Sequence, residues 1–307
     1  MGMRLGFGLP VSGAWADAAN IARFAVRAEE LGYGSLWAFQ RLLVAADQEL
    51  DPVYQSVLDP LVALTFAAAR TSRIRLGVAV VNLPFVSPAY LAKQAATLDL
   101  LSGGRFDLGL GVGWSPAEFA ATGASPERRG ARAEEYLAVL RTLWGDETSR
   151  YDGEFYTVPP ARMAPKPAQR PGPPVLLGGS APAALRRAGR LADGWITRSA
   201  HDLSGIGADI AVVRAAARRA GRDPDGMRIV VRGVLRLGHP GGPGRPRLAG
   251  THDEVRADLD WLAGQGVTEV FLDLNWDPLI GSLNADPAAA TDRADGILHA
   301  FAPLARE

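Results

Sequence analysis

The sequence predicts a (β/α)8 barrel, in which eight parallel strands are each followed by a helix. The first observation is that short apolar segments alternate along the chain with segments of helical spacing. The second is length, because 307 residues suit one barrel of roughly 250 residues with insertions. The third is that 48% of the residues are hydrophobic, enough for a large core. We therefore expect a single domain over residues 1–307, with insertions at about 145–174 and 238–250.

The first half of the chain supplies four of the expected strands. Asp59-Pro60 and Ser87-Pro88 mark helix starts, because the first side chain caps the helix and proline lacks an N–H that would stay unpaired there. Gly103 marks a helix end. These signals place strands at residues 5–9, 35–38, 74–81 and 106–110, and helices at residues 18–31, 60–69 and 88–102.

The second half repeats the pattern. Residues 115–118 and 251–254 have the form S/T-x-x-E, which predicts capping boxes that open helices, and Asp286-Pro287 predicts the last helix start. Strands are expected at residues 175–177, 195–196, 229–237 and 270–274, and further helices at residues 128–144, 182–191, 203–220 and 252–263. The segment 238–250 is too rich in Gly and Pro for regular structure, so we expect a mobile loop. A doubly wound open sheet is the alternative, but the first strand-to-helix turn lacks a G-x-G-x-x-G motif.

Composition excludes several classes of protein. Lys+Arg and Asp+Glu are equal at 33 each, so no basic face predicts nucleic acid or a membrane surface as a partner. The absence of cysteine excludes disulfides and thiolate chemistry, and the four histidines lack metal-binding spacing, so no metal is expected. No apolar run approaches the ~20 residues that span a membrane, and the first residues make a poor signal peptide. We expect a soluble cytoplasmic protein that acts on a small molecule.

The most informative segment is AKQAATLDLLSGGRFDLGLGVGW, residues 92–114. Gly109, Gly111 and Gly113 remove side chains from the end of an expected strand, so a flat or anionic ligand can approach the backbone there. The carboxyl ends of parallel strands are where barrels place their sites. Trp114 follows directly, and we expect it to wall this pocket or, in the alternative, to pack in the core.

A second glycine-rich strand end lies at Gly178, Gly179 and Ser180. Ser180 is expected to cap the following helix. Exposed backbone N–H groups at a helix N-terminus bind anions. The alternative is an ordinary turn whose glycines only relieve crowding.

Blocks in order along nearly the whole chain support a family resemblance. They are RLGFGLP (4–10), LGYGSLW (31–37), TSRIRLGVAVV (71–81), EFAATG (118–123), PPVLLGGS (173–180), RRAGRLADGWI (186–196) and AGTHDEVRADL (249–259). With residues 92–114, they resemble the bacterial luciferase-like family, most closely its branch that uses the deazaflavin coenzyme F-420. The resemblance implies a flavin-type pocket and a homodimer formed through the second and third helices.

The resemblance also implies roles for particular residues. It implies a strand bulge with a non-prolyl cis peptide between Ala79 and Val80, behind the coenzyme ring, and Asn82 beside it as a catalytic candidate. In the alternative, Asn82 only ends the strand. It implies that the coenzyme contacts Gln40, Ala79, Val80, Gly111, Gly113, Trp114, Gly178, Gly179, Ser180 and Arg198. Arg245 and Arg247 either reach an anionic coenzyme tail or are solvated surface charges.

The chain departs from its relatives after the second strand. Where F-420-dependent relatives have an Asp-His pair, this chain has Gln40 and Arg41. Arginine keeps its charge, so it is a poor proton shuttle but a good fixed cation that can stabilise an enolate or bind a carboxylate. In the alternative, Arg41 merely pairs with an acidic residue such as Asp47, Glu49 or Asp51.

Three functions follow from these observations. The first is an F-420-dependent oxidoreductase that reduces an activated C=C or C=N bond, because alcohol oxidation needs a base that Arg41 does not provide. The second is an FMN-dependent monooxygenase of the same fold. The third is a non-catalytic flavin-binding relative, suggested only by the Gln40-Arg41 change.

Overall fold

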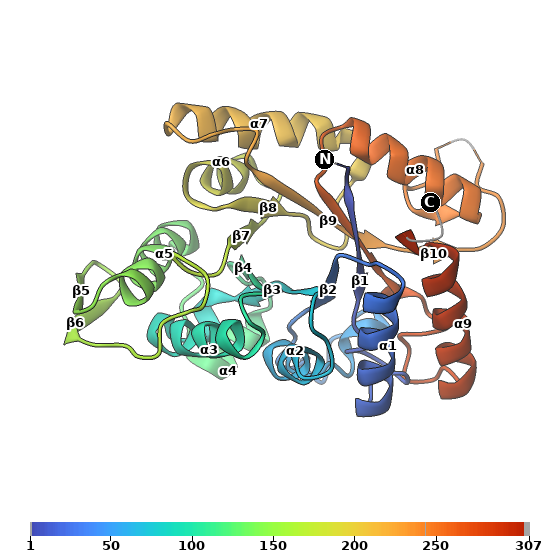
Figure 1. Cartoon of the computed structure of the whole chain (residues 1–307), viewed down its shortest axis with the longest axis horizontal. Coiled ribbons are helices and arrows are strands. Elements are labelled where there is room, and N and C mark those ends of the chain that lie inside the picture. The colour runs from blue at the N-terminus through green and yellow to red at the C-terminus, as the bar shows by residue number, and fades with distance from the viewer. Residues whose placement is uncertain (1, 243, 304–307) are drawn as a thin grey trace.

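The computed structural model describes residues 2–242 and 244–303, and it shows a closed barrel of parallel strands (Figure 1). The strand order is β1-β12-β9-β8-β7-β4-β3-β2, and β1 pairs with both β2 and β12. The barrel strands are β1 (Arg4–Gly8), β2 (Ser35–Ala38), β3 (Arg75–Asn82), β4 (Phe106–Gly111), β7 (Val175–Gly178), β8 (Gly194–Ile196), β9 (Arg228–Val234) and β12 (Glu269–Asp273). The predicted barrel is confirmed, and the open sheet is wrong because the ring is closed.

Helices surround the barrel on its outer side (Figure 1). They are α1 (Ala18–Glu30), α2 (Pro60–Ala68), α3 (Pro88–Leu101), α4 (Pro116–Thr122), α5 (Arg129–Gly145), α6 (Pro182–Leu191), α7 (Ile206–Arg219), α8 (His252–Gly264) and α9 (Pro287–Ala300). The side chains of Asp59, Ser87 and Asp286 cap their helices as predicted, and Thr251 and Glu254 form the complete capping box. None of the helices in the described part of the chain is long and apolar enough to cross a bilayer.

The two insertions adopt more structure than the sequence predicted. The first contains the antiparallel hairpin of β5 (Ser149–Asp152) and β6 (Thr157–Ala161), beside α5 at the left of Figure 1. In the second, β11 (Ala249–Gly250) pairs with β10 (Arg236–Leu237), so the expectation of no regular structure is wrong there. The predicted strand 229–237 is also corrected, because the chain leaves the barrel after Val234 and pairs with β11 instead.

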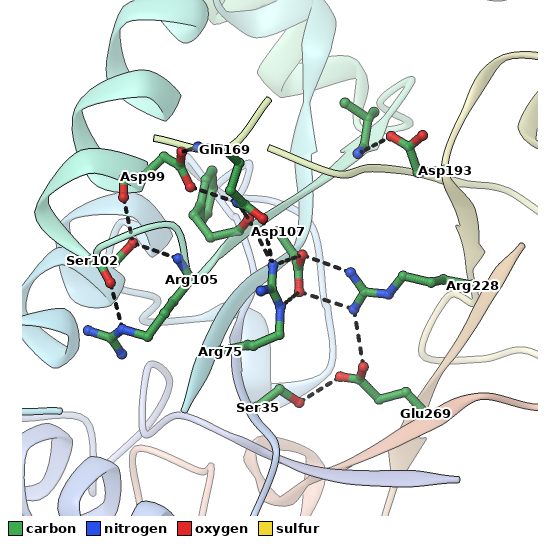
Figure 2. A network of polar contacts seen from close by, with 12 residues as sticks. Ser35, Arg75, Asp99, Ser102, Arg105, Asp107, Gln169, Asp193, Arg228 and Glu269 are labelled. Carbon is green, nitrogen blue, oxygen red and sulfur yellow. Dashed lines mark hydrogen bonds and ion pairs between the residues drawn. The ribbon is translucent and has the colours of Figure 1, made fainter. Parts of the chain in front are cut away.

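A layer of charged side chains closes the amino-terminal end of the barrel (Figure 2). Arg75 Nη2 and Arg228 Nη1 lie 2.5 and 2.7 Å from Asp107 Oδ1, and Arg228 also donates to Glu269 at 3.2 Å. Burial disfavours the charge on Asp107, but the hydrogen bonds from Arg75 and the charge of Arg228 outweigh it and lower the pKa of Asp107. The layer is therefore a fully paired ion network, as a buried carboxylate requires.

An aromatic layer lies on top of this charged layer and fills the middle of the barrel. Trp37 stacks on Phe271 with ring centroids 5.2 Å apart, and its Nε1 donates to Glu269 Oε1 at 2.8 Å. Gly77 makes room for it, because a Cβ there would lie 2.4 Å from the indole ring. The amino-terminal half of the barrel is thus solid, which leaves only its carboxyl end to hold a ligand.

Candidate active site

A cavity of about 520 Å³ opens at the carboxyl ends of the barrel strands. Residues in or after seven of the eight barrel strands line it, as expected for a barrel active site. The predicted site residues among them are Gln40, Arg41, Ala79, Val80, Asn82, Gly111, Gly113, Trp114, Gly178, Gly179 and Arg198. Of the predicted set, only Ser180 lies outside the cavity lining, and it is exposed. The structure therefore brings together side chains that are up to 158 positions apart, from Gln40 to Arg198.

The glycines of β4 fit against a bulge in β3. The register of β3 on β4 shifts between Val78 and Val81, and the peptide bond between Ala79 and Val80 is cis, as the resemblance implied. A Cβ on Gly109 would lie 2.0 Å from the carbonyl oxygen of Val78, and one on Gly111 would lie 2.5 Å from Val80 Cγ2. These two glycines are therefore required by the packing of the two strands, and Gly111, which lines the cavity beside Val80, adds no side chain of its own to this wall.

The two glycines after β7 differ in what their positions require. A Cβ on Gly178 would meet nothing closer than 3.5 Å, so crowding does not explain this glycine. Because Gly178 lines the cavity, a larger residue would occupy cavity space. Gly179 has φ of +124°, and a Cβ there would lie 2.7 Å from that of Ala184, so its backbone requires glycine. The absence of a side chain at Gly178 therefore favours a ligand-binding role for this strand end. Gly179 is explained by an ordinary turn.

The predicted helix cap at Ser180 is wrong. The N-cap of α6 is Ala181, and no side chain accepts a hydrogen bond there. The reason is Pro182, which occupies the first helical turn and holds the preceding residue in an extended conformation, with φ of −66° and ψ of 145° at Ala181.

Gln40 connects the ends of two neighbouring strands. Its Oε1 accepts a hydrogen bond of 2.8 Å from the backbone N–H of Asn82, and both residues line the cavity. This bond fixes the side chain after β2 against the end of β3. Among the described residues, the side-chain nitrogen of Gln40 has no hydrogen-bond acceptor, so it can donate to a ligand.

Arg41 is held in place from three directions. Its Nη1 lies 2.9 Å from Glu118 Oε2, and its Cζ lies 4.4 Å from the ring centroid of Tyr54 and 4.6 Å from that of Trp114. The side chains of Arg41 and Glu118 are 4% and 0% exposed. Arg41 Nε is also buried and lacks a hydrogen-bond acceptor among the described residues. The guanidinium is therefore a fixed cation at the cavity wall.

The partner of Arg41 corrects two expectations. Arg41 does pair with a carboxylate, but with Glu118 of α4 and not with Asp47, Glu49 or Asp51. The capping box predicted at residues 115–118 is only half formed. Ser115 accepts from the backbone of Glu118 at 3.5 Å, whereas the Glu118 carboxylate binds Arg41 and the backbone N–H of Leu42. Glu118 thus joins α4 to the segment after β2.

A second buried ion pair lines the cavity and was not predicted. Arg232 Nε lies 2.7 Å from Asp273 Oδ2, and Arg232 Nη1 donates to the carbonyl oxygen of Ala79 at 3.3 Å. The sequence held a signal for Arg232 itself but not for its partner. Arg228 and Arg232 are four residues apart, which places both on one face of a strand, and charged residues are unusual in strands that are expected to be buried on both faces.

Aromatic side chains complete the wall that contains the two arginines. Tyr54 packs edge-to-face on Trp276 with centroids 5.3 Å apart, and Arg232 Cζ lies 4.3 Å from the ring centroid of Phe39. Trp114 is 50% exposed at the rim. The cavity thus has bare backbone on one wall and aromatic and guanidinium faces on another, which suits a flat, partly anionic molecule.

Two further tryptophans in barrel strands, Trp37 and Trp195, do not line the cavity. Trp37 belongs to the aromatic layer beneath it. Trp195 is fully buried beside His201, and its Nε1 donates to the carbonyl oxygen of Gly179 at 2.8 Å. Trp195 therefore supports the turn after β7 from behind.

Comparison with known proteins agrees with the barrel fold. A family model described as luciferase-like monooxygenase matches residues 4–240. An uncharacterised protein of Mycobacterium tuberculosis is 45% identical over 148 residues, which are 48% of this chain and 52% of that protein. An FMNH2-dependent dimethylsulfone monooxygenase of Pseudomonas putida is 35% identical over 156 residues, 50% of this chain and 42% of that enzyme.

Two further matches widen the comparison. An F-420-dependent glucose-6-phosphate dehydrogenase of Amycolatopsis mediterranei is 33% identical over 184 residues, 59% of this chain and 53% of that enzyme. The chain thus spans about half the length of the curated relatives it matches. The crystal structure of monooxygenase RslO1 from Streptomyces bottropensis superposes with a TM-score of 0.80, at 26% identity and over 99% of both chains.

Proposed function

Because the chain belongs to the luciferase-like monooxygenase family, we propose that it transfers a hydride from reduced coenzyme F-420 to an activated C=C or C=N bond of a small organic molecule. Relatives use either F-420 or FMN, so a deazaflavin or flavin coenzyme is common to both enzyme hypotheses. One observation carries the proposal most directly. Gly178 has room for a side chain yet lacks one, and it lies on the bare wall of a cavity that suits a flat ring.

The residues of the cavity fit such a coenzyme. Gly178 offers bare backbone and Val80, beside Gly111, offers an apolar side chain to the face of a ring. The free side-chain nitrogen of Gln40 can donate to a ring carbonyl. Arg198 is exposed at the rim beside Gly179, where it can neutralise a phosphate. When bound, the coenzyme supplies the hydride, and the protein supplies position and charge.

The polar groups of the cavity support the proposed direction of the reaction. A site that oxidises an alcohol needs a base near neutral pH to take the hydroxyl proton. Among the described residues that line the cavity there is no histidine, and Asp51, the one carboxylate, is exposed. Arg41 and the buried Asn82 can instead hydrogen-bond to negative charge that develops on a substrate being reduced. These groups favour reduction.

An FMN-dependent monooxygenase is the second candidate, favoured by the 35% identity to the dimethylsulfone enzyme. A fluorescence titration of the purified protein with F-420 and with FMN separates the candidates. We expect saturable binding of F-420. Tight binding of FMN alone would replace the proposal with the monooxygenase, and binding of neither would leave a non-catalytic relative.

We also propose that residues 1–307 act as one domain and that the chain forms a homodimer through α2 and α3. The segment 4–240 alone lacks β12, the strand that closes the barrel onto β1. Apolar side chains are exposed on both helices: Val62 is 69% exposed on α2, and Leu101 is 65% exposed on α3. Sedimentation velocity should show a dimer for the wild type and a monomer for Val62→Asp. A monomeric wild type would refute the dimer.

A further inference from the structure

A second cavity, of about 1080 Å³, adjoins the active-site cavity. The two share Ser199, Ala200 and Arg232 in their linings, so a molecule in one can extend into the other. The second cavity lies between the segment after β8 and the segment that runs from β10 to β11. In Figure 1, β10 and the start of this second segment are at the right, near α8. The coenzyme proposal assigns no ligand to it.

The lining of this second cavity is rich in arginine. Arg232, Arg236, Arg245 and Arg247 contribute to it, against one acidic residue, Asp202. Arg232, Arg245 and Arg247 are each paired with a carboxylate, so Arg236 carries the unpaired positive charge of the lining. This charge favours an anionic ligand, because the arginine fork matches the oxygens of carboxylates and phosphates.

Two of these arginines share a single carboxylate. Arg245 Nη1 and Arg247 Nη1 lie 2.6 and 2.7 Å from the two oxygens of Asp258, which is buried on α8. The hydrogen bond that Arg245 donates to Asp258 raises the pKa of Arg245, and Glu254 lies 3.5 Å from Arg245 Nε. These contacts fix the segment before β11 against α8, so this wall of the cavity is held in place without a ligand.

The other two arginines have unused donors. Arg232 is paired with Asp273, and its side chain is only 7% exposed, yet its Nη2 is buried without a hydrogen-bond partner among the described residues. Arg236 is exposed, and its side chain makes neither a hydrogen bond nor an ion pair within the described chain. A buried donor without an acceptor costs free energy unless a ligand supplies one.

The remaining titratable group of the lining does not add a cation at neutral pH. Burial lowers the pKa of His201 despite Asp209, whose Oδ2 lies 3.0 Å from His201 Nε2. The attraction for anions therefore comes from the arginines.

We propose that this second cavity binds an oxyanion, a carboxylate or a phosphate, of the molecule whose reacting end occupies the active-site cavity. Arg232 lines both cavities, so it lies between the reacting end and the anionic end of the bound molecule. Arg236 supplies an unpaired cation for the anionic end. The assignment of the anion to coenzyme or substrate rests on the proposed function, whereas the anion site itself does not.

Binding of inorganic phosphate, followed by calorimetry, tests the site. Removing the free cation in Arg236→Gln should weaken phosphate binding about 10-fold, the loss expected for one charge-assisted hydrogen bond. Arg236→Lys should retain most of the affinity because it keeps the charge. Arg150→Gln is the control, since Arg150 is exposed on β5, far from β10 in Figure 1. Equal phosphate affinity in Arg236→Gln and the wild type, or no binding to the wild type, would overturn the proposal.

A second titration identifies the source of the anion. It compares F-420 with the same chromophore lacking the anionic tail, in wild type and Arg236→Gln. Weaker binding of only the complete coenzyme assigns the anion to the coenzyme, and unchanged binding of both assigns it to the substrate. If neither chromophore binds to the wild type, the proposed function fails, while the phosphate titration still decides whether the anion site exists.

Discussion

Arg41 shows at the scale of a single residue how one side chain is fixed in the cavity wall by its neighbours. Its guanidinium is paired with Glu118 and lies between Tyr54 and Trp114, so neither its charge nor its position depends on a bound ligand. A buried arginine fixed in this way is ready to stabilise charge at the moment it develops, with little reorganisation.

A pair of variants separates the structural role of Arg41 from its chemical role. Arg41→Ala leaves Glu118 buried without its partner, so we expect it to lower the free energy of unfolding by about 3–5 kcal/mol. Arg41→Ala/Glu118→Gln removes both charges and should recover much of that loss in urea unfolding. Turnover should remain about 100-fold lower in both variants. Full turnover in the double variant would show that Arg41 serves the fold alone.

At the scale of elements, the bulged β3 and the glycine-rich β4 are one structural unit. The missing Cβ of Gly109 leaves room for the carbonyl oxygen of Val78 where the register shifts, and the missing Cβ of Gly111 leaves room for the side chain of Val80. The bare wall of the cavity is therefore a consequence of strand packing as well as a feature that suits a ligand.

This unit predicts a strong effect at Gly109. In Gly109→Ala the new Cβ would lie 2.0 Å from a backbone oxygen, so the strands must separate, which we expect to cost about 1–3 kcal/mol of stability or more. Gly264→Ala, at an exposed position with nothing within 4 Å, is the matched control and should not destabilise the protein. Thermal unfolding measures both. A Gly109→Ala protein as stable as the control would contradict this strand packing.

The sequence predicted what local rules determine and missed what long-range pairing determines. Helix caps and strand-end glycines are local, so the barrel and its glycine-rich strand ends could be predicted from them. The cavity residues Gln40, Ala79, Val80, Asn82 and Arg198 were implied by the family resemblance instead. Arg232 pairs with Asp273 across 41 positions, and Arg41 pairs with Glu118 across 77, and neither pairing has a signature in the intervening residues. The position at which β9 ends was mispredicted for the same reason, because the residues after Val234 pair with β11 outside the barrel.

At the scale of the whole molecule, the amino-terminal end of the barrel serves stability and the carboxyl end serves ligand binding. The amino-terminal end is closed by the network around Asp107, and the carboxyl end is hollow. This division agrees with the general rule that barrels separate stability from activity along their axis.

The network makes stability depend on pH in a defined direction. The pKa of Asp107 is lowered on folding, so its contribution is present above about pH 4, the value for an unfolded aspartate, and is lost as the pH falls through the folded value. Asp107→Asn should lose about 3–5 kcal/mol at neutral pH and respond less to acid. Urea unfolding between about pH 3 and pH 7 measures this. Parallel curves for the two proteins would exclude Asp107 as a source of the acid sensitivity.

The dissociation constant of F-420 for Gly178→Leu tests the central claim most directly. Since Gly178 has an ordinary backbone conformation and room for a Cβ, the variant should keep the unfolding temperature of the wild type. Its side chain should fill the cavity and weaken coenzyme binding by at least about 100-fold, or about 2.7 kcal/mol. Gly264→Leu, on the exposed end of α8, should bind like the wild type. Folded Gly178→Leu protein that binds F-420 as tightly as the wild type would show that the coenzyme does not occupy this cavity.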